Sequence, residues 1–362
     1  MKRYTRMTSL AGAMAAGAML MGCSSDDNLD RFEFPNFPSI AMAGADEDRR
    51  ADADLTGDAL AYQAALIYET TLNFRDYDAI ERPLTDEPNG RTDCALEGYI
   101  HHDRYTYNWP GPYGTGPVQV QQVTSYGCTV TDAEYNAAGQ RAVVGQLSFI
   151  DDEVTDDGAE QTISYSSWGT DFPYRVQYLG PAGAGQNDRR RVEVHGVTLD
   201  GPGEPIEVGG TDRAVLERAQ DLLVTNAIGL VSDAGVVSDQ TVFTVRYGGG
   251  DDGEFVRREI AGVNQLQLEG AIGSGSTRDD ACVGGRFQVE TVANLAVNAG
   301  NIVTGTLALT SGTGDGAQEA SLVFQTNGDI NVTDADGATD TLTRAELEAL
   351  RTTCFQTVVA KR

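Results

Sequence analysis

Short segments of β-branched and aromatic residues, separated by glycine, aspartate and asparagine clusters, run through most of this chain and constrain its fold more than any other feature. In residues 241–260, glycines and an Asp-Gly pair separate two alternating segments, which indicates a β-hairpin. Residues 320–343 repeat the pattern with Asn327-Gly328 and Asp336-Gly337. Successive hairpins predict a mainly β protein built from antiparallel meander sheets, arranged as a sandwich or an open barrel.

Two or three short helices are expected within this β framework. Apolar residues recur at helical spacing from about Asp54 onward, and a second helical stripe occupies residues 211–228. A third candidate spans residues 341–351, where Thr343 and Glu346 have the spacing of a capping box.

The N-terminus has the pattern of a bacterial secretion signal. Lys2, Arg3 and Arg6 precede an apolar, small-residue stretch that is too short for a stop-transfer helix. The stretch ends in Leu20-Met21-Gly22-Cys23, which resembles the lipobox of bacterial lipoproteins. The resemblance implies a signal peptide over residues 1–22, cleavage before Cys23, and lipidation of Cys23 with a diacylglycerol group and a further acyl chain such as palmitate.

The family resemblance also bears on location. Ser24 after the lipidated cysteine implies sorting to the outer membrane, as a lipid-anchored protein on either the periplasmic or the cell-surface face. The segments that begin at Cys94 and Cys282 are similar to β-rich envelope lipoproteins of Gram-negative bacteria that have no characterised activity. This second resemblance implies no function.

The mature chain divides into three predicted parts. Residues 23–53 are rich in acidic residues and proline, which is typical of a flexible tether. A weak similarity between residues 136–149 and 298–309 suggests two related β-rich modules, over residues 54–205 and 206–362. The alternative is chance similarity between glycine-rich strands.

The charge is strongly negative: 54 acidic residues stand against 26 basic ones, for a net charge of −28. Such a field repels phosphate backbones, so a nucleic-acid partner is not expected. The acidity suits either a surface kept soluble in salt or a set of weak Ca²⁺ sites. Asp251, Asp252 and Glu254 are the candidate metal ligands, and no other cofactor is expected.

Four cysteines remain once Cys23 is set aside, and they allow three disulfide pairings. Envelope proteins face an oxidising compartment in which disulfides persist. The sequential pairing, Cys94–Cys128 and Cys282–Cys354, gives each predicted module one bridge. We therefore favour it over the two crossed alternatives.

One aromatic segment is the main candidate for binding. Tyr105, Tyr107, Trp109 and Tyr113 lie among prolines and glycines, which favours either a platform for a protein or glycan partner or a long connection that packs its own aromatics. Just before it, His101, His102 and Asp103 form a polar strand end, or part of a transition-metal site if His195 lies near.

Motifs of nucleophilic, metal-dependent or nucleotide-binding enzymes are absent from the sequence, so no catalytic residue is assigned. The leading hypothesis is a membrane-anchored envelope lipoprotein with a non-catalytic binding or structural role. The alternatives are a glycan hydrolase that uses a pair of carboxyl groups, and a carrier of lipid or lipoproteins.

Overall fold

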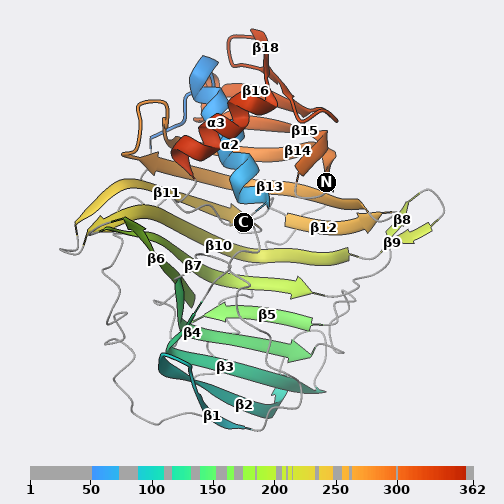
Figure 1. The fold of residues 1–362 in the computed structure, drawn as a ribbon. Helices are drawn as coiled ribbons and strands as arrows, with labels where there is room; N and C mark the ends of the chain where they lie inside the picture. Colours follow the sequence, from blue (N-terminus) through green and yellow to red (C-terminus); the bar gives the residue numbers. More distant parts are fainter. Residues whose placement is uncertain are drawn as a thin grey trace.

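A computed structural model describes most of the chain after the predicted tether. The described residues are 51–72, 89–109, 116–131, 139–151, 161–166, 174–183, 186–200, 206–208, 211–213, 215–232, 236–247, 255–260, 263–298 and 301–355. They form a 16-stranded antiparallel sheet, a separate two-stranded hairpin and two α-helices (Figure 1). The prediction of a mainly β, antiparallel fold is confirmed.

The described elements follow one another in a simple order. The first strands are β1 (Gly90–Asp93), β2 (Glu97–Trp109), β3 (Gly116–Thr131), β4 (Gln140–Asp151), β5 (Gln161–Ser166), β6 (Tyr174–Gly183), β7 (Gln186–Asp200), β8 (Ile206–Val208) and β9 (Thr211–Arg213). The later strands are β10 (Val215–Ser232), β11 (Val237–Tyr247), β12 (Phe255–Ile260), β13 (Val263–Ser276), β14 (Gly285–Asn298), β15 (Asn301–Ser311), β16 (Gln318–Phe324), β17 (Ile330–Thr333) and β18 (Thr339–Leu342). The helices are α2 (Gly57–Leu72), the short 3₁₀ turn η3 (Gly314–Gly316) and α3 (Arg344–Cys354).

The sheet is a meander in which two positions are each filled by two strands in line. β5 and β6 both lie between β4 and β7, and β11 and β12 both lie between β10 and β13. The hairpin predicted over residues 241–260 is therefore wrong, because β11 and β12 each pair with β10 and β13 and not with each other. The order of strands across the sheet therefore still follows the order of the chain.

The helix predicted over residues 211–228 is wrong, because this segment forms β9 and most of β10. β10 pairs with β7 on one side and with β11 and β12 on the other. These ladders satisfy its backbone along both edges and place Val224 and Ile228 in the core. Tertiary pairing overrides a helical apolar spacing that is compatible with either structure.

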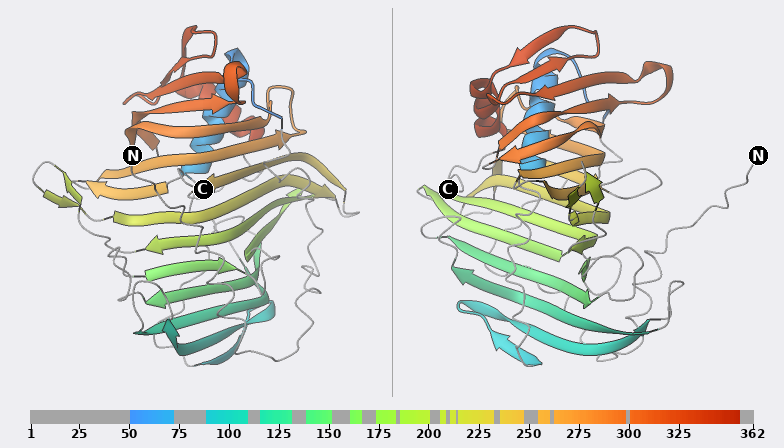
Figure 2. Two further views of the ribbon diagram at one scale, coloured as in Figure 1. Left: turned by 180° about the vertical axis from the view of Figure 1, so that it is seen from behind. Right: turned by 90° about the vertical axis from the view of Figure 1, so that its right-hand side faces the viewer.

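Helix α2 is buried along most of its length, where it lies between the curved strands of the sheet's C-terminal half and α3 (Figure 2). Tyr62, Gln63, Leu66 and Ile67 have no solvent-exposed surface, and a helix that is apolar all round is expected to be buried. The Tyr62 hydroxyl donates to Ser274 Oγ on β13 at 3.0 Å. The helix predicted to begin near Asp54 is therefore confirmed, as the central element of the core.

Helix α3 lies beside α2 and confirms the predicted capping box. The Thr343 hydroxyl accepts a bond from the Glu346 backbone, and the Glu346 carboxylate accepts one from the Thr343 backbone. Farther along, the Arg351 guanidinium donates to Glu69 of α2 at 2.7 Å. Burial opposes the charge of Arg351, but the neighbouring Glu69 and Glu348 carboxylates together outweigh it and raise the Arg351 pKa above its usual value.

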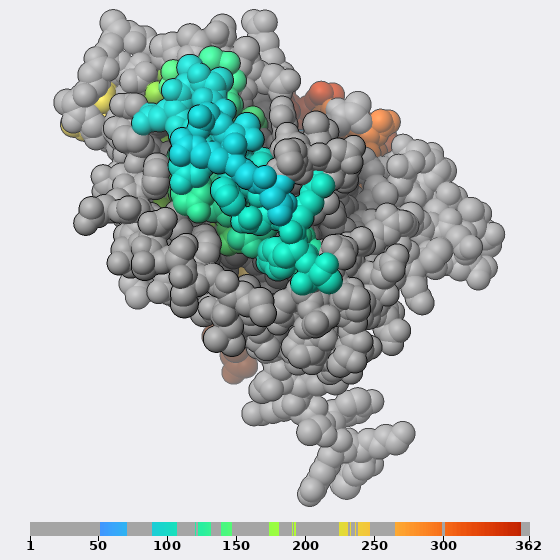
Figure 3. Space-filling model, turned by 90° about the horizontal axis from the view of Figure 1, so that it is seen from below, coloured from blue at the N-terminus to red at the C-terminus, as the bar shows by residue number. Residues whose placement is uncertain are grey.

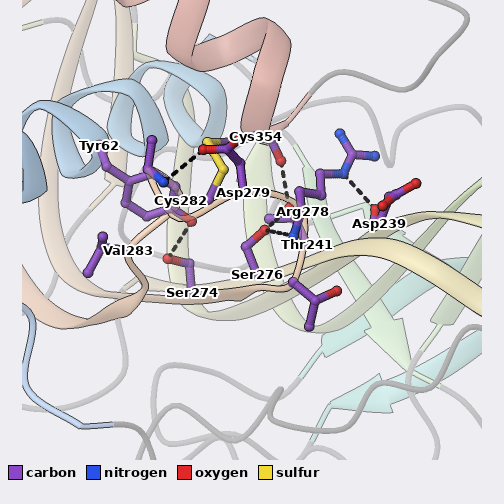
Figure 4. Close-up of a disulfide and its surroundings, with 12 residues drawn as sticks. Tyr62, Asp239, Thr241, Ser274, Ser276, Arg278, Asp279, Cys282, Val283 and Cys354 are labelled. Carbon is purple, nitrogen blue, oxygen red and sulfur yellow. Dashed lines mark hydrogen bonds between the residues drawn. A yellow bond between two sulfur atoms is a disulfide. The ribbon is translucent and has the colours of Figure 1, made fainter.

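The disulfide Cys282–Cys354 fixes the end of α3 to the segment between β13 and β14 (Figure 4). The Thr241 hydroxyl donates to the carbonyl oxygen of Cys354 at 2.6 Å. The next residue, Phe355, packs between Tyr62 of α2 and Phe243 of β11. The bridge thus closes a buried aromatic cluster over α2.

Residues 51–55 already belong to the folded body. Asp52 forms a parallel bridge with Arg286 at the start of β14, and the Ser311 hydroxyl donates to the Ala53 carbonyl at 2.6 Å. The Leu55 amide donates to Gln318 Oε1 at 2.7 Å. The chain thus enters the described body at the β14–β16 side of the sheet.

Strands from both predicted modules belong to the same 16-stranded sheet. β7 and β10 lie on either side of the predicted boundary at residues 205 and 206, and they pair directly along most of their lengths. Helix α2, from the first predicted module, is bonded to β13 and α3 of the second. The proposed internal repeat stays a prediction.

Candidate binding surface on β1, β2 and β3

The first three strands form one edge of the sheet and present a polar and aromatic face to solvent. Their core-facing side includes Ile100 and Val123, which pack in or against the main core. Because side chains alternate along a strand, the partners on the other face point away from that core. This face, called the β1–β3 surface, includes Arg91, Asp93, Tyr99, His101, Asp103, Tyr105, Gln122 and Tyr126. Val120 and Thr124 of β3 lie on the same face but are buried.

The strands that carry this surface lie at the exterior when the molecule is seen from below (Figure 3). Arg91 and Asp93 belong to β1, which is the edge strand, and their side chains are 58% and 74% exposed. Tyr105 of β2 is 39% exposed. Large side chains with this exposure on regular strands are available to a partner.

A ladder of stacked side chains crosses the three strands. The Arg91 guanidinium lies 4.0 Å above the centre of the Tyr99 ring, and the Tyr126 ring stacks on Tyr99 with its centre 4.5 Å away. The two neighbours come from the strands on either side of β2, so both faces of the Tyr99 ring are covered. Arg91 also pairs with Asp93 at 2.7 Å. This ladder is rigid, because each member constrains the next.

Two further polar pairs extend the surface along β2. His101 Nδ1 lies 3.1 Å from Asp103 Oδ2, and this contact fixes the orientation of the imidazole ring. The Tyr105 hydroxyl donates to Gln122 Oε1 on β3 at 3.1 Å. These pairs are formed before any partner binds, so less conformational entropy is lost on binding.

A disulfide and a close backbone approach set the geometry of this edge. Cys94, directly after β1, is bonded to Cys128 on β3. Gly98 has a φ of +72°, and a Cβ atom there would overlap the Gly127 backbone, so glycine is required where β2 meets the bulge in β3. The Cys94 amide donates to the Gly98 carbonyl at 3.0 Å and closes the turn between β1 and β2, and the Leu96 amide donates to the Thr129 carbonyl at 3.0 Å and ties this turn to β3.

The predicted binding residues are only partly brought onto this surface. Tyr105 is part of it, Tyr107 and Trp109 follow at the next two alternate positions of β2, and Tyr113 lies outside the described residues. Register between strands had to be known before Arg91, Gln122 and Tyr126 could be placed beside them. Alternation along β2 was the one available signal, since it places Tyr99, His101 and Asp103 on the same face as Tyr105.

The sheet does not assemble the histidine metal site considered from the sequence. His102 pairs with Val123 on the core-facing side, and His195 lies on β7, separated from β2 by β3, β4 and the β5–β6 position. Within the described ranges, no group of three or more histidine, cysteine or acidic side chains is arranged to hold a metal ion. Asp251, Asp252 and Glu254 lie outside those ranges, so the weak Ca²⁺ site stays a prediction.

Both disulfides have the predicted sequential pairing, Cys94–Cys128 and Cys282–Cys354. No helix in the described part of the chain has the length and apolar character needed to cross a membrane. The sequence matches no protein-family model, and no curated protein or solved structure is significantly similar to it.

Proposed function

We propose that the chain is a lipoprotein of the outer membrane, anchored through lipidated Cys23, and that its β1–β3 surface binds a protein partner without catalysing a reaction. The observation that carries the proposal is the pre-formed ladder of Arg91, Tyr99 and Tyr126 beside Tyr105, in which Arg91 and Tyr105 are exposed and the two stacked tyrosines are half-buried. Tyrosine and arginine are the residue types most enriched at the energetic centres of protein interfaces.

The covered ring of Tyr99 favours a protein over a glycan. A sugar binds an aromatic side chain by stacking on a free ring face, whereas Arg91 and Tyr126 already occupy both faces of Tyr99. The net charge of −28 further favours a partner with a basic surface, because opposite charge accelerates association and like charge opposes it.

The position of the surface suits an anchored binding protein. The chain coming from Cys23 joins the body at Asp52, beside β14, whereas the surface lies on the first strands of the sheet. Eight strand positions separate β2 from β14, which corresponds to about 40 Å at the usual spacing between strands. The proposed anchor therefore enters far from the proposed binding surface.

The inner face of the sheet supports a binding role over a carrier role. A lipid carrier needs a free apolar concavity, but α2 fills the inner face of the C-terminal half with fully buried side chains such as Leu66 and Ile67. A hydrolase would need a pair of carboxyl groups available for catalysis. On the β1–β3 surface the carboxylates are Asp93 and Asp103, and they are already paired with Arg91 and with His101.

The proposal can be tested with the mature chain secreted as a Cys23→Ser variant. The probe is outer-membrane vesicles from cells that lack this protein, and binding is followed by co-sedimentation. Tyr105→Ala is expected to weaken binding at least tenfold, since it removes an exposed anchor side chain. Val323→Ala is the matched control, because Val323 is 36% exposed on β16 at the far side of the sheet. Equal binding by both variants would contradict the assignment.

Two controls address the other parts of the proposal. Mass spectrometry of the mature N-terminus is expected to find an acylated Cys23, and an unmodified residue there would remove the anchor. Release of reducing sugars from envelope glycans, abolished by Asp103→Asn, would show that the protein is an enzyme.

A further inference from the structure

We propose that the Cys94–Cys128 disulfide is a redox-controlled latch that holds the β1–β3 surface together and releases it on reduction. The consequence for partner binding rests on the function proposed above, but the latch itself does not. The two disulfides lie in different surroundings, and β1 pairs with one strand among the described elements, with two hydrogen bonds between Asn89 and Arg104 at its start.

The two disulfides differ in their access to solvent. Cys282 and Cys354 are 4% and 0% exposed, and both belong to the main core cluster under α3. Cys94 is partly exposed and follows the edge strand directly, and Cys128 is 6% exposed. Thiol–disulfide exchange requires a thiolate to reach a sulfur atom, so access favours reaction at Cys94–Cys128.

Strand β1 depends on this bridge. Among the described elements β1 pairs only with β2, through the four residues Gly90–Asp93. The bridge ties the residue after β1 to β3, across β2. A four-residue strand at the edge of a sheet frays readily, because its other edge has no neighbour in the sheet.

Opening the bridge is a balanced exchange with a dithiol reductant. One thiolate of the reductant attacks a sulfur of the Cys94–Cys128 bond, which breaks and leaves a mixed disulfide and one cysteine thiolate. The second thiol of the reductant then displaces the other cysteine. The reductant ends as a disulfide, and Cys94 and Cys128 each end as a thiol.

Reduction is expected to dismantle the surface through Arg91 and Asp93. Both side chains lie on β1, so fraying of β1 takes the guanidinium away from the Tyr99 ring. One face of that ring then becomes free, and the ladder loses its outer member. The oxidised and reduced proteins would thus present different surfaces to the same partner.

The test is a titration of the native full-length protein with dithiothreitol, followed by alkylation and peptide mapping. We expect Cys94 and Cys128 to become alkylated at a dithiothreitol concentration at least tenfold below that needed for Cys282 and Cys354. In the same samples, amide hydrogen exchange is expected to rise at least tenfold in residues 90–93 and to stay unchanged in residues 286–289. These readouts need no partner, so they are independent of the proposed function.

A variant without the bridge provides the matched control. Cys94→Ala/Cys128→Ala is expected to show fast exchange in residues 90–93 without reductant; should it fail to fold, the titration of the native protein still decides. Opening of Cys282–Cys354 first, opening of both bridges together, or slow exchange of β1 after selective reduction would each overturn the proposal.

Discussion

The two ends of the sheet each carry a disulfide, but the link has a different physical setting at each end. At the C-terminal end, Cys282–Cys354 lies within a layered body, in which α2 and α3 pack against the inner face of the strands. At the N-terminal end, Cys94–Cys128 joins strands at an edge where β1 has one neighbour. The Cys282–Cys354 bridge therefore reinforces a packed core, whereas the Cys94–Cys128 bridge holds an edge strand that has little packing of its own.

The largest expected effect is the loss of stability on removing a disulfide, and it should differ between the two bridges. Cys282→Ala/Cys354→Ala is expected to lower the free energy of unfolding by about 4 kcal/mol, because the unfolded chain regains the entropy of a long loop. Loop length alone predicts nearly the same loss for Cys94→Ala/Cys128→Ala. We expect a smaller loss in global stability there, because β1 can fray locally without unfolding the sheet. If both variants lowered the midpoint urea concentration of unfolding by the same amount, the proposed difference between the core bridge and the edge bridge would be contradicted.

The ion pair between the helices tests how tightly the C-terminal end is packed. The Glu69 side chain is 8% exposed, so Arg351→Met leaves a buried carboxylate without its cation. We expect a loss of about 3 kcal/mol in urea unfolding. Adding Glu69→Gln should restore most of that loss. A double variant as unstable as Arg351→Met would contradict this explanation.

The segment that enters the body provides a smaller test. Gln318→Met removes the oxygen that accepts the Leu55 amide, so a part-buried N–H loses its partner. The expected cost is about 2 kcal/mol in the same unfolding assay. Gln325→Met, whose side chain donates at an exposed site, is the control and should change little. A change in both variants of the same size would show that the amide contact is not the cause.

The cap of α3 gives an effect that depends on pH. Thr343→Ala is expected to cost about 1 kcal/mol at neutral pH by removing the N-cap hydroxyl. Hydrogen bonds from the Thr343 side chain and then from its backbone lower the pKa of Glu346. This contribution is present above the usual glutamate pKa and is lost as the pH falls through the lowered value. NMR titration should show the Glu346 pKa rising in the variant, and an unchanged pKa would contradict the role of the cap.

The smallest expected effect is at the edge. Arg91→Ala removes the guanidinium from the Tyr99 ring and should cost only about 0.5 kcal/mol, because the Arg91 side chain is largely exposed to solvent. Calorimetry should therefore show almost no shift in the melting temperature, while the NMR resonances of the Tyr99 ring should move. A large loss of global stability would mean that the edge belongs to the main folding unit.

Local signals predicted the parts of the fold that depend on neighbouring residues. Thr343 and Glu346 specify the start of α3 through three-residue spacing alone, and the turns at Asn327-Gly328 and Asp336-Gly337 indicated the pairing of β16 with β17 and of β17 with β18. The same kind of signal failed in residues 241–260, where β11 and β12 lie in line between β10 and β13 instead of forming a hairpin. The segment 211–228 shows the limit, because its helical spacing carries no information on the strands that pair with it. The contact between Arg91 and Tyr99 was likewise invisible, since it depends on the register between β1 and β2.

Photo-crosslinking in living cells tests the central claim most directly. The native, lipid-anchored chain would carry a photoreactive phenylalanine analogue at position 105 on the β1–β3 surface or, as the matched control, at position 323 on the opposite half of the sheet. We predict one discrete protein adduct from position 105 that is absent from position 323 and is lost when Tyr99→Ala is added. No adduct from position 105, or the same adducts from both positions, would contradict the proposed binding surface.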